Sequence, residues 1–226
     1  MAPLLVVVGA LWVVTSCLSP EQELVSRFLQ AVANGDRPTM AMLSARGFDE
    51  PVDTWEILEI ADAPTTPYPV PDLREAVDLA ERARDEQFQI YSEFRQANYN
   101  RLAQIQKLQQ NNPEHRFGGQ LEELRVEWED QRTDRRERVR RLQEAEIRLA
   151  DEIKTVNQSL QRESTPEYLN GELLNKLVHV RLVQEGAPRD FTFRISKYEL
   201  TNQFDAAVPS RWLITAIHPR DSVGEP

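Results

Sequence analysis

The residues best suited to chemistry in this sequence are carboxylates and arginines, and most of them lie in one helical stretch. Adjacent acids occur there at, among other places, Glu122-Glu123, Glu129-Asp130 and Asp151-Glu152. Two neighbouring carboxylates can supply a general acid and a general base. Each pair, however, has Arg or Lys three or four residues away, which is the spacing of ion pairs on one helix. The pattern therefore predicts a solvated helix face, and we assign no catalytic residue.

An arginine-rich segment, residues 132–141, lies within the same stretch. It holds six arginines against two acids, although the chain as a whole has a net charge of −10. Such a local excess can orient an acidic protein surface or an anionic head group. We expect Arg135, Arg136 and Arg138 to steer a partner, and the alternative for this segment is again a solvated helix face.

Other residue types with chemical potential are few. His115, His179 and His218 are far apart and lack the spacing of metal ligands, and a single cysteine forms no internal disulfide. No phosphate-binding loop or nucleophile elbow occurs. We therefore expect no metal site, no cofactor and no enzyme activity. The acidic composition, with a pI near 4.9, argues against nucleic acid as a partner.

The single cysteine, Cys17, follows an apolar leader. Residues 4–14 form an uncharged apolar run with the length of a signal-peptide core, which is short for a membrane span. The run ends in Val14-Thr15-Ser16-Cys17, which resembles the lipobox of bacterial lipoproteins. The resemblance implies removal of residues 1–16, lipidation of Cys17 and a membrane partner reached through an N-terminal lipid anchor.

Two details of the leader bear on location. Leu18 stands where an Asp would be the familiar inner-membrane retention signal, so we expect the periplasmic face of the outer membrane in a bacterial cell envelope. The leader has no Lys or Arg before the apolar run, which keeps an uncleaved membrane anchor as the alternative.

Two long helices are predicted at residues 72–110 and 120–163. Neither range contains Pro or Gly, and apolar residues recur at three- and four-residue steps. Asn-Asn-Pro and Gly-Gly between them stop the first helix and let the chain reverse. Because each apolar stripe is narrow, we expect the helices to pair as a hairpin or coiled coil. We also expect that a short linker could replace residues 72–163 without unfolding the remainder.

The flanking segments predict a small α+β body. Ser19 to Gln22 has the pattern of a helix start. Strands are expected at 55–60, 176–184, 191–196 and 212–217, and the prolines between 64 and 71 predict a stiff linker. The predicted fold is thus α+β, with a small antiparallel sheet packed by an N-terminal helix and interrupted by the hairpin. The expected parts are a signal peptide (1–16), two body segments (17–70 and 164–226) and the hairpin (71–163).

The body also carries a family resemblance. The stretch from Pro20-Glu21 through Phe28-Leu29 to Gly35-Asp36, followed by Met42-Leu43 and Phe48, resembles the cystatin-like or nuclear-transport-factor-two-like family, especially its lipoprotein members. The resemblance implies a helix packed across a curved antiparallel sheet. In related folds the helix and curved sheet form a cone, which sometimes holds an acid–base pair. In this sequence no motif brings together the candidate residues near the sheet: Tyr198, His179, Asp190 and Trp212.

These observations favour a non-enzymatic envelope lipoprotein whose hairpin is an interaction or spacer module. Six apolar residues of the two helices do not all lie on one seam: Val77, Val126 and four aromatic residues. We expect the four aromatic residues to contact a second copy or an envelope protein. They are Phe88, Tyr91, Phe94 and Trp128. The alternatives are a small apolar-ligand-binding or isomerase-like cone, and an adaptor-like component of an envelope export system.

Overall fold

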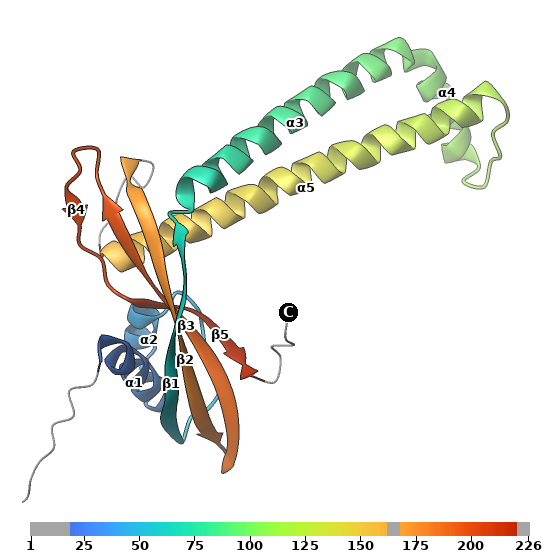
Figure 1. Ribbon diagram of the computed structural model, residues 1–226. Coiled ribbons are helices and arrows are strands. Elements are labelled where there is room, and N and C mark those ends of the chain that lie inside the picture. The colour runs from blue at the N-terminus through green and yellow to red at the C-terminus, as the bar shows by residue number, and fades with distance from the viewer. Residues whose placement is uncertain (1–18, 162–167, 221–226) are drawn as a thin grey trace, which may run out of the picture. The chain divides into compact units, whose positions relative to one another are not determined.

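The computed structural model describes residues 19–161 and 168–220, so that the leader and Cys17 lie outside the described residues. Within these ranges the chain forms helices and one five-stranded sheet (Figure 1). The elements are α1 (Pro20–Ala33), α2 (Arg37–Leu43), β1 (Thr54–Pro67), α3 (Val70–Ala97), α4 (Tyr99–Asn111), α5 (Gln120–Leu160), β2 (Asn170–Gln184), β3 (Ala187–Thr201), β4 (Ala207–Val208) and β5 (Leu213–Pro219). The predicted α+β class is confirmed. No helix in the described ranges is both long and apolar enough to cross a membrane.

The described chain divides into two compact units. The first draws its described residues from 1–64, 175–196 and 212–226, and the second from 65–174 and 197–211. The first unit therefore contains α1, α2, β5 and most of the long strands. The second contains α3, α4, α5, β4 and one end of β1, β2 and β3.

The sheet has the order β1-β2-β3-β4, and β5 also pairs with β3. Both β4 and β5 run antiparallel to β3, with Leu200 opposite Val208 and Phe193 opposite Ile217. A two-residue turn, Glu185 and Gly186, joins β2 to β3 with positive φ at both positions, which is the requirement of a tight hairpin turn. All four predicted strands share this sheet, and β1, β2 and β3 extend well beyond their predicted ends.

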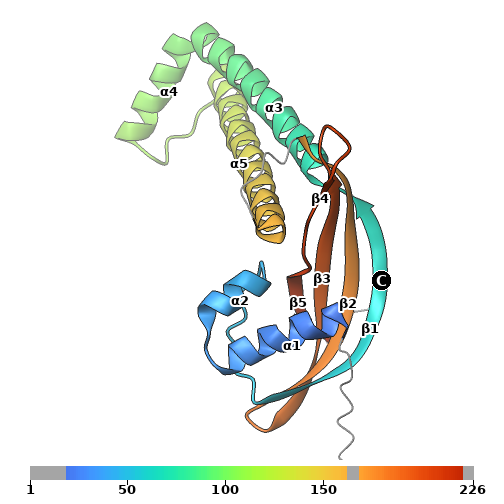
Figure 2. The ribbon, with the colours of Figure 1, turned by 90° about the vertical axis from the view of Figure 1, so that its left-hand side faces the viewer.

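Helix α1 begins as predicted at a capping box. The Ser19 side chain accepts from the backbone N–H of Gln22, and the Gln22 side chain accepts from the backbone N–H of Ser19. The apolar face of α1 is buried against the sheet, on the same side as α2 (Figure 2). Phe28 makes edge-to-face contacts with Phe48 at 6.4 Å and with Phe193 at 6.2 Å between ring centres. The space between helix and sheet is thus filled by aromatic side chains.

An ion pair fixes the first turn of α1 to the sheet. The Lys176 Nζ lies 2.6 Å from the Glu21 carboxylate and 5.6 Å from the centre of the Trp212 ring. Burial alone would raise the pKa of Glu21, but the hydrogen bond from Lys176 and the other donors at the helix start lower it below its ordinary value. The charged pair therefore contributes to holding α1 on β2.

One detail of the first long helix and one of the segment before it differ from prediction. The first predicted helix is interrupted at Asn98, whose backbone leaves the helical region and whose side-chain Nδ2 donates to the Phe94 carbonyl at 3.0 Å. The prolines at 64 and 67 belong to β1 and are not part of a free linker. Because β1 ends the strand order, these prolines remove no hydrogen bond that a central strand would need.

Helices α3 and α5 lie side by side in both views, and we call them the helical pair (Figures 1 and 2). Knobs-into-holes packing along the pair remains a prediction. Its base is a buried cluster in which Val156 and Leu160 of α5 meet Tyr198 and Leu200 of β3. The Tyr198 hydroxyl donates to Glu152 of α5 at 2.6 Å, and burial together with this carboxylate raises the pKa of Tyr198. The base of the pair is therefore part of a core.

Candidate functional site

Figure 1 shows α4 at the end of the helical pair remote from β4. A second buried cluster joins α4 to α3 and α5. It is formed by Tyr91, Leu102, Ile105, Leu124 and Trp128, with Phe94, Phe117 and Leu121 packed against it. Beside it, the buried Gln87 of α3 donates to the side chain of Gln131 of α5 at 2.9 Å. These contacts hold the facing surfaces of α3 and α5 at a fixed separation and register.

Arg135 of α5 reaches across to α3. Its guanidinium carbon lies 5.3 Å from the centre of the Tyr91 ring and 5.7 Å from the centre of the Phe88 ring. Both distances are within the range of cation–π attraction, which is worth about 0.5–1 kcal/mol at an exposed site. Phe88 keeps 54% of its surface exposed, whereas Tyr91 keeps 7%. The Phe88 ring is therefore open to solvent, whereas the Tyr91 ring is buried in the cluster.

Two hollows meet at Tyr91 and Arg135. The first has a volume of about 370 Å³ and is lined by Phe88, Tyr91, Ser92, Arg95, Gln96, Tyr99 and Arg135. The second has a volume of about 330 Å³ and is lined by Tyr91, Arg132, Arg135, Arg136 and Val139. We call the two together the Arg135 groove. Among the described residues, no Asp or Glu lines either hollow, so the charged side chains in the lining of the groove are all positive.

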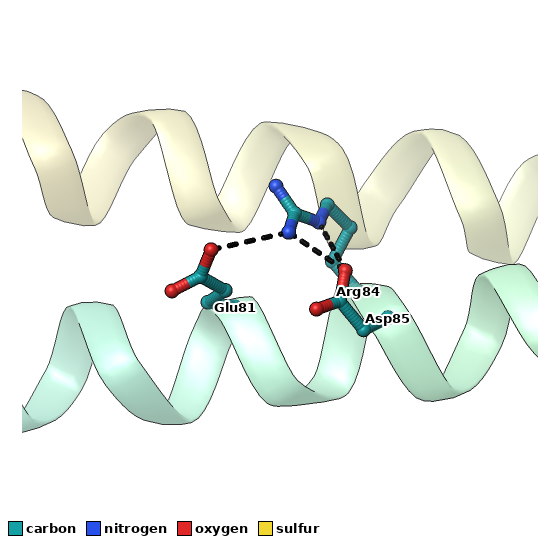
Figure 3. Close-up of polar contacts among 3 residues, drawn as sticks. All are labelled: Glu81, Arg84 and Asp85. Atoms are coloured by element: carbon teal, nitrogen blue, oxygen red, sulfur yellow. Dashed lines mark hydrogen bonds and ion pairs between the residues drawn. The ribbon is translucent and has the colours of Figure 1, made fainter.

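Most other arginines of the helical pair are neutralised within their own helix. Figure 3 shows Arg84 of α3 between Glu81 and Asp85, at 3.3 Å and 2.7 Å. Arg138 of α5 lies 3.4 Å from Asp134. Exposed pairs of this kind contribute little to stability, but they cancel charge.

The arginines of the groove have no such partner. Arg95, Arg132, Arg135 and Arg136 form no ion pair with any carboxylate of the described residues. Arg136 donates instead to the Arg132 carbonyl and to a threonine hydroxyl. The groove thus gathers four uncompensated positive charges on a protein with a net charge of −10.

The structure places some of the predicted contact residues in the Arg135 groove and others in the buried cluster or in an ion pair. Phe88, Tyr91, Arg135 and Arg136 come together in the groove. Trp128 is 8% exposed and buried in the cluster, where Arg132 covers its ring at 5.3 Å.

Phe94 is partly buried against the same cluster, and Arg138 is paired on α5. Trp128 and Phe94 therefore stabilise the helical pair and present little surface to a partner. Cys17 lies outside the described residues.

Sequence reasoning missed Arg95, Tyr99 and Arg132. Helical spacing carries a signal for two of them, since Tyr91, Arg95 and Tyr99 follow one another at four-residue steps. A second signal is the lack of an acid three or four residues from Arg95, Arg135 or Arg136. Tyr99, at 69% exposed, is the most open aromatic ring of the groove.

The paired carboxylates behave in two ways. Glu122 and Glu129 both bind Arg125, each at 2.6 Å, and the hydrogen bond from Arg125 lowers the pKa of Glu122. This is the expected solvated helix face. Glu152 differs, because it accepts the hydrogen bond of the buried Tyr198 hydroxyl.

The other residues considered for a cone site have separate local partners. His179 contacts the Thr192 hydroxyl at 3.0 Å, and Asp190 accepts two hydrogen bonds from Arg181, which lower its pKa. Trp212 lies next to Lys176. These contacts are those of a structural sheet surface.

Comparisons with protein families, curated proteins and solved structures found no match to this chain.

Proposed function

We propose that this protein is a lipid-anchored, non-enzymatic component of a bacterial cell envelope, whose helical pair is a docking or spacer module. The observation that carries the proposal is the Arg135 groove, an exposed aromatic surface with four arginines that form no ion pair with the carboxylates of residues 19–161 and 168–220. Exposed apolar surface combined with one sign of charge is typical of a contact site. We propose a cystatin-like body for the first unit, supported by α1 packed across an antiparallel sheet.

The anchoring part of the proposal is supported by the sequence around Cys17. The lipobox-like Val14-Thr15-Ser16-Cys17 follows an apolar run, and the chain has no other cysteine. Helix α1 begins at Pro20, so only two residues separate the proposed anchor from the folded unit. Two or more acyl chains would hold such a protein stably on a bilayer, since each buried methylene contributes about 0.8 kcal/mol.

Replacing Cys17 by Ser is expected to abolish lipidation. The variant should then accumulate as a larger, unprocessed precursor or leave the membrane fraction, whereas the wild-type protein should be released only by detergent. Metabolic labelling with a radioactive fatty acid, followed by gel electrophoresis of membrane and soluble fractions, measures both effects. Equal mobility and equal fractionation of the two chains would contradict the anchoring proposal.

The docking part is tested by cross-linking in intact cells. A photo-reactive phenylalanine derivative at Tyr99 should give a discrete adduct on irradiation, because this ring lies in the groove. The same derivative at Phe204 is the matched control, since Phe204 is 78% exposed and lines neither hollow. No adduct from position 99, or the same products from both positions, would leave only the spacer function.

A further inference from the structure

We propose, building on the docking function above, that the Arg135 groove binds an acidic protein segment that also carries aromatic side chains. The juxtaposition that points to this ligand is a guanidinium whose carbon lies 5.3 Å and 5.7 Å from the centres of two aromatic rings, with no carboxylate of the described chain to neutralise it.

The state of Arg135 favours a carboxylate ligand. The side chain is exposed, and it makes no hydrogen bond to any other residue that the structure describes. Its N–H donors are therefore available, and its contacts with the Tyr91 and Phe88 rings place the guanidinium in the groove. The guanidinium group itself presents its donors as a planar fork, which is suited to a bidentate contact with a carboxylate. Arg95, Arg132 and Arg136 extend the same preference along the groove.

The exposed aromatic rings of the groove favour a ligand segment that carries apolar side chains as well as acidic ones. Phe88 and Tyr99 are the most exposed rings of the groove, and both line the larger hollow. An aromatic ring of the ligand would bury surface against them, which contributes roughly 25 cal/mol per Å² of apolar area. The two hollows share Tyr91 and Arg135, so an extended segment can occupy both, whereas one head group fills only one.

The charge around the groove argues for a narrow ligand over a membrane surface. Residues 72–110 and 120–163 carry 19 acids against 16 bases, and four of those bases are the groove arginines. A broad anionic bilayer would therefore meet many carboxylates of the helical pair as well as the groove. A single acidic segment can lie in the groove and avoid them.

The probe for this inference is a random copolymer of glutamate and tyrosine, with polyglutamate as the probe that lacks rings. We expect the full chain in detergent micelles to bind the copolymer more tightly than polyglutamate. Arg135→Glu should weaken copolymer binding about tenfold or more, because it reverses the charge beside the Phe88 and Tyr91 rings. Phe88→Ser should remove the preference for the copolymer over polyglutamate. Fluorescence anisotropy of the labelled polymers measures these affinities.

The matched control is Arg141→Glu. Arg141 is exposed on the same helix and is paired with Glu137, so its replacement changes the net charge by the same amount outside the groove. We expect this variant to lose less than about twofold in affinity, because its charge lies outside the groove and salt screens exposed charges. Equal losses for both arginine variants would mean unspecific attraction and would overturn the inference. Circular dichroism establishes that each variant is folded before binding is compared.

Three other outcomes would also overturn the inference. One is binding to phosphatidylglycerol vesicles that depends on Arg135 while copolymer binding does not. Another is an Arg135-dependent dimer in sedimentation equilibrium, which would make a second copy the occupant. The third is an adduct from position 99 in cells that Arg135→Glu leaves unchanged, in which case the docking function stands and the acidic ligand does not. Absence of any adduct from position 99 would instead reject the docking function itself.

Discussion

Replacing Gly171 by alanine is expected to destabilise the second unit by about 3 kcal/mol or more. Gly171 has φ of +145°, a region that residues with a side chain rarely adopt. A Cβ at this position would lie 2.0 Å from the Glu199 carbonyl oxygen and 3.0 Å from the Leu200 Cα. These atoms belong to the backbone of β3 and cannot rotate away. The Gly171 carbonyl also accepts from the Tyr68 N–H at 2.9 Å, so a shift of β2 would disturb the entry to α3.

Urea unfolding followed by circular dichroism measures this effect. The matched control is Gly118→Ala in the same unit, where an added Cβ meets nothing within 4 Å and φ is not positive. We expect the control to unfold close to the wild type and Gly171→Ala to unfold at much lower urea, or to be recovered only as an unfolded chain. Similar midpoints for the two variants would contradict the close approach of β2 and β3 at this position.

Shortening the helical pair is expected to abolish ligand binding completely while leaving the rest of the protein folded. A short Gly/Ser loop in place of residues 82–140 removes the whole Arg135 groove and the cluster around Trp128. It keeps the base of the pair, where Val70, Val156 and Leu160 are buried. Loop closure costs little extra free energy over this change in length. The shortened protein should melt cooperatively and should fail to bind the glutamate–tyrosine copolymer.

The larger replacement of residues 72–163, which the sequence favours, is the comparison. It removes Val156 and Leu160 from their contacts with Tyr198 and Leu200, and the loss of each such buried aliphatic side chain costs about 2–5 kcal/mol. We therefore expect this variant to melt earlier and less cooperatively than the shorter replacement. Since Val156 and Leu160 lie in the core at the base of the pair, we expect the removable part of the insertion to be shorter than residues 72–163. Identical melting of the two variants would mean that the base of the pair is not part of a core.

Local sequence determined the elements whose signals are short-range. The capping box at Ser19 and the apolar face that follows it defined α1, since both depend on residues within a few turns. The alternation of Phe191, Phe193 and Ile195 defined the part of β3 buried under α1. The alternation continues beyond Ser196 with its phase reversed, so that Tyr198 and Leu200 are buried with residues of α5 at the base of the helical pair.

Tertiary packing decided where the first long helix ends. Asn98 is only a weak helix breaker, with a propensity cost below about 0.7 kcal/mol relative to alanine. The break turns α4 so that Leu102 and Ile105 are buried with Leu124 and Trp128. Burial of two large aliphatic side chains contributes about 1.5–3 kcal/mol each. The burial contribution is therefore larger than the helix propensity of Asn98, and it depends on α5, which is distant in sequence.

The Arg135 groove likewise depends partly on local sequence and partly on tertiary packing. Sequence alone determines that Arg135 and Arg136 have no acid at the spacing of a helical ion pair, whereas Arg138 has Asp134 four residues earlier. It could not determine that Arg135 would cover Phe88 and Tyr91, because that contact joins residues more than forty positions apart. Only the pairing of α3 with α5 brings those rings beneath the guanidinium, and only this pairing makes a solvated arginine-rich helix face into a groove.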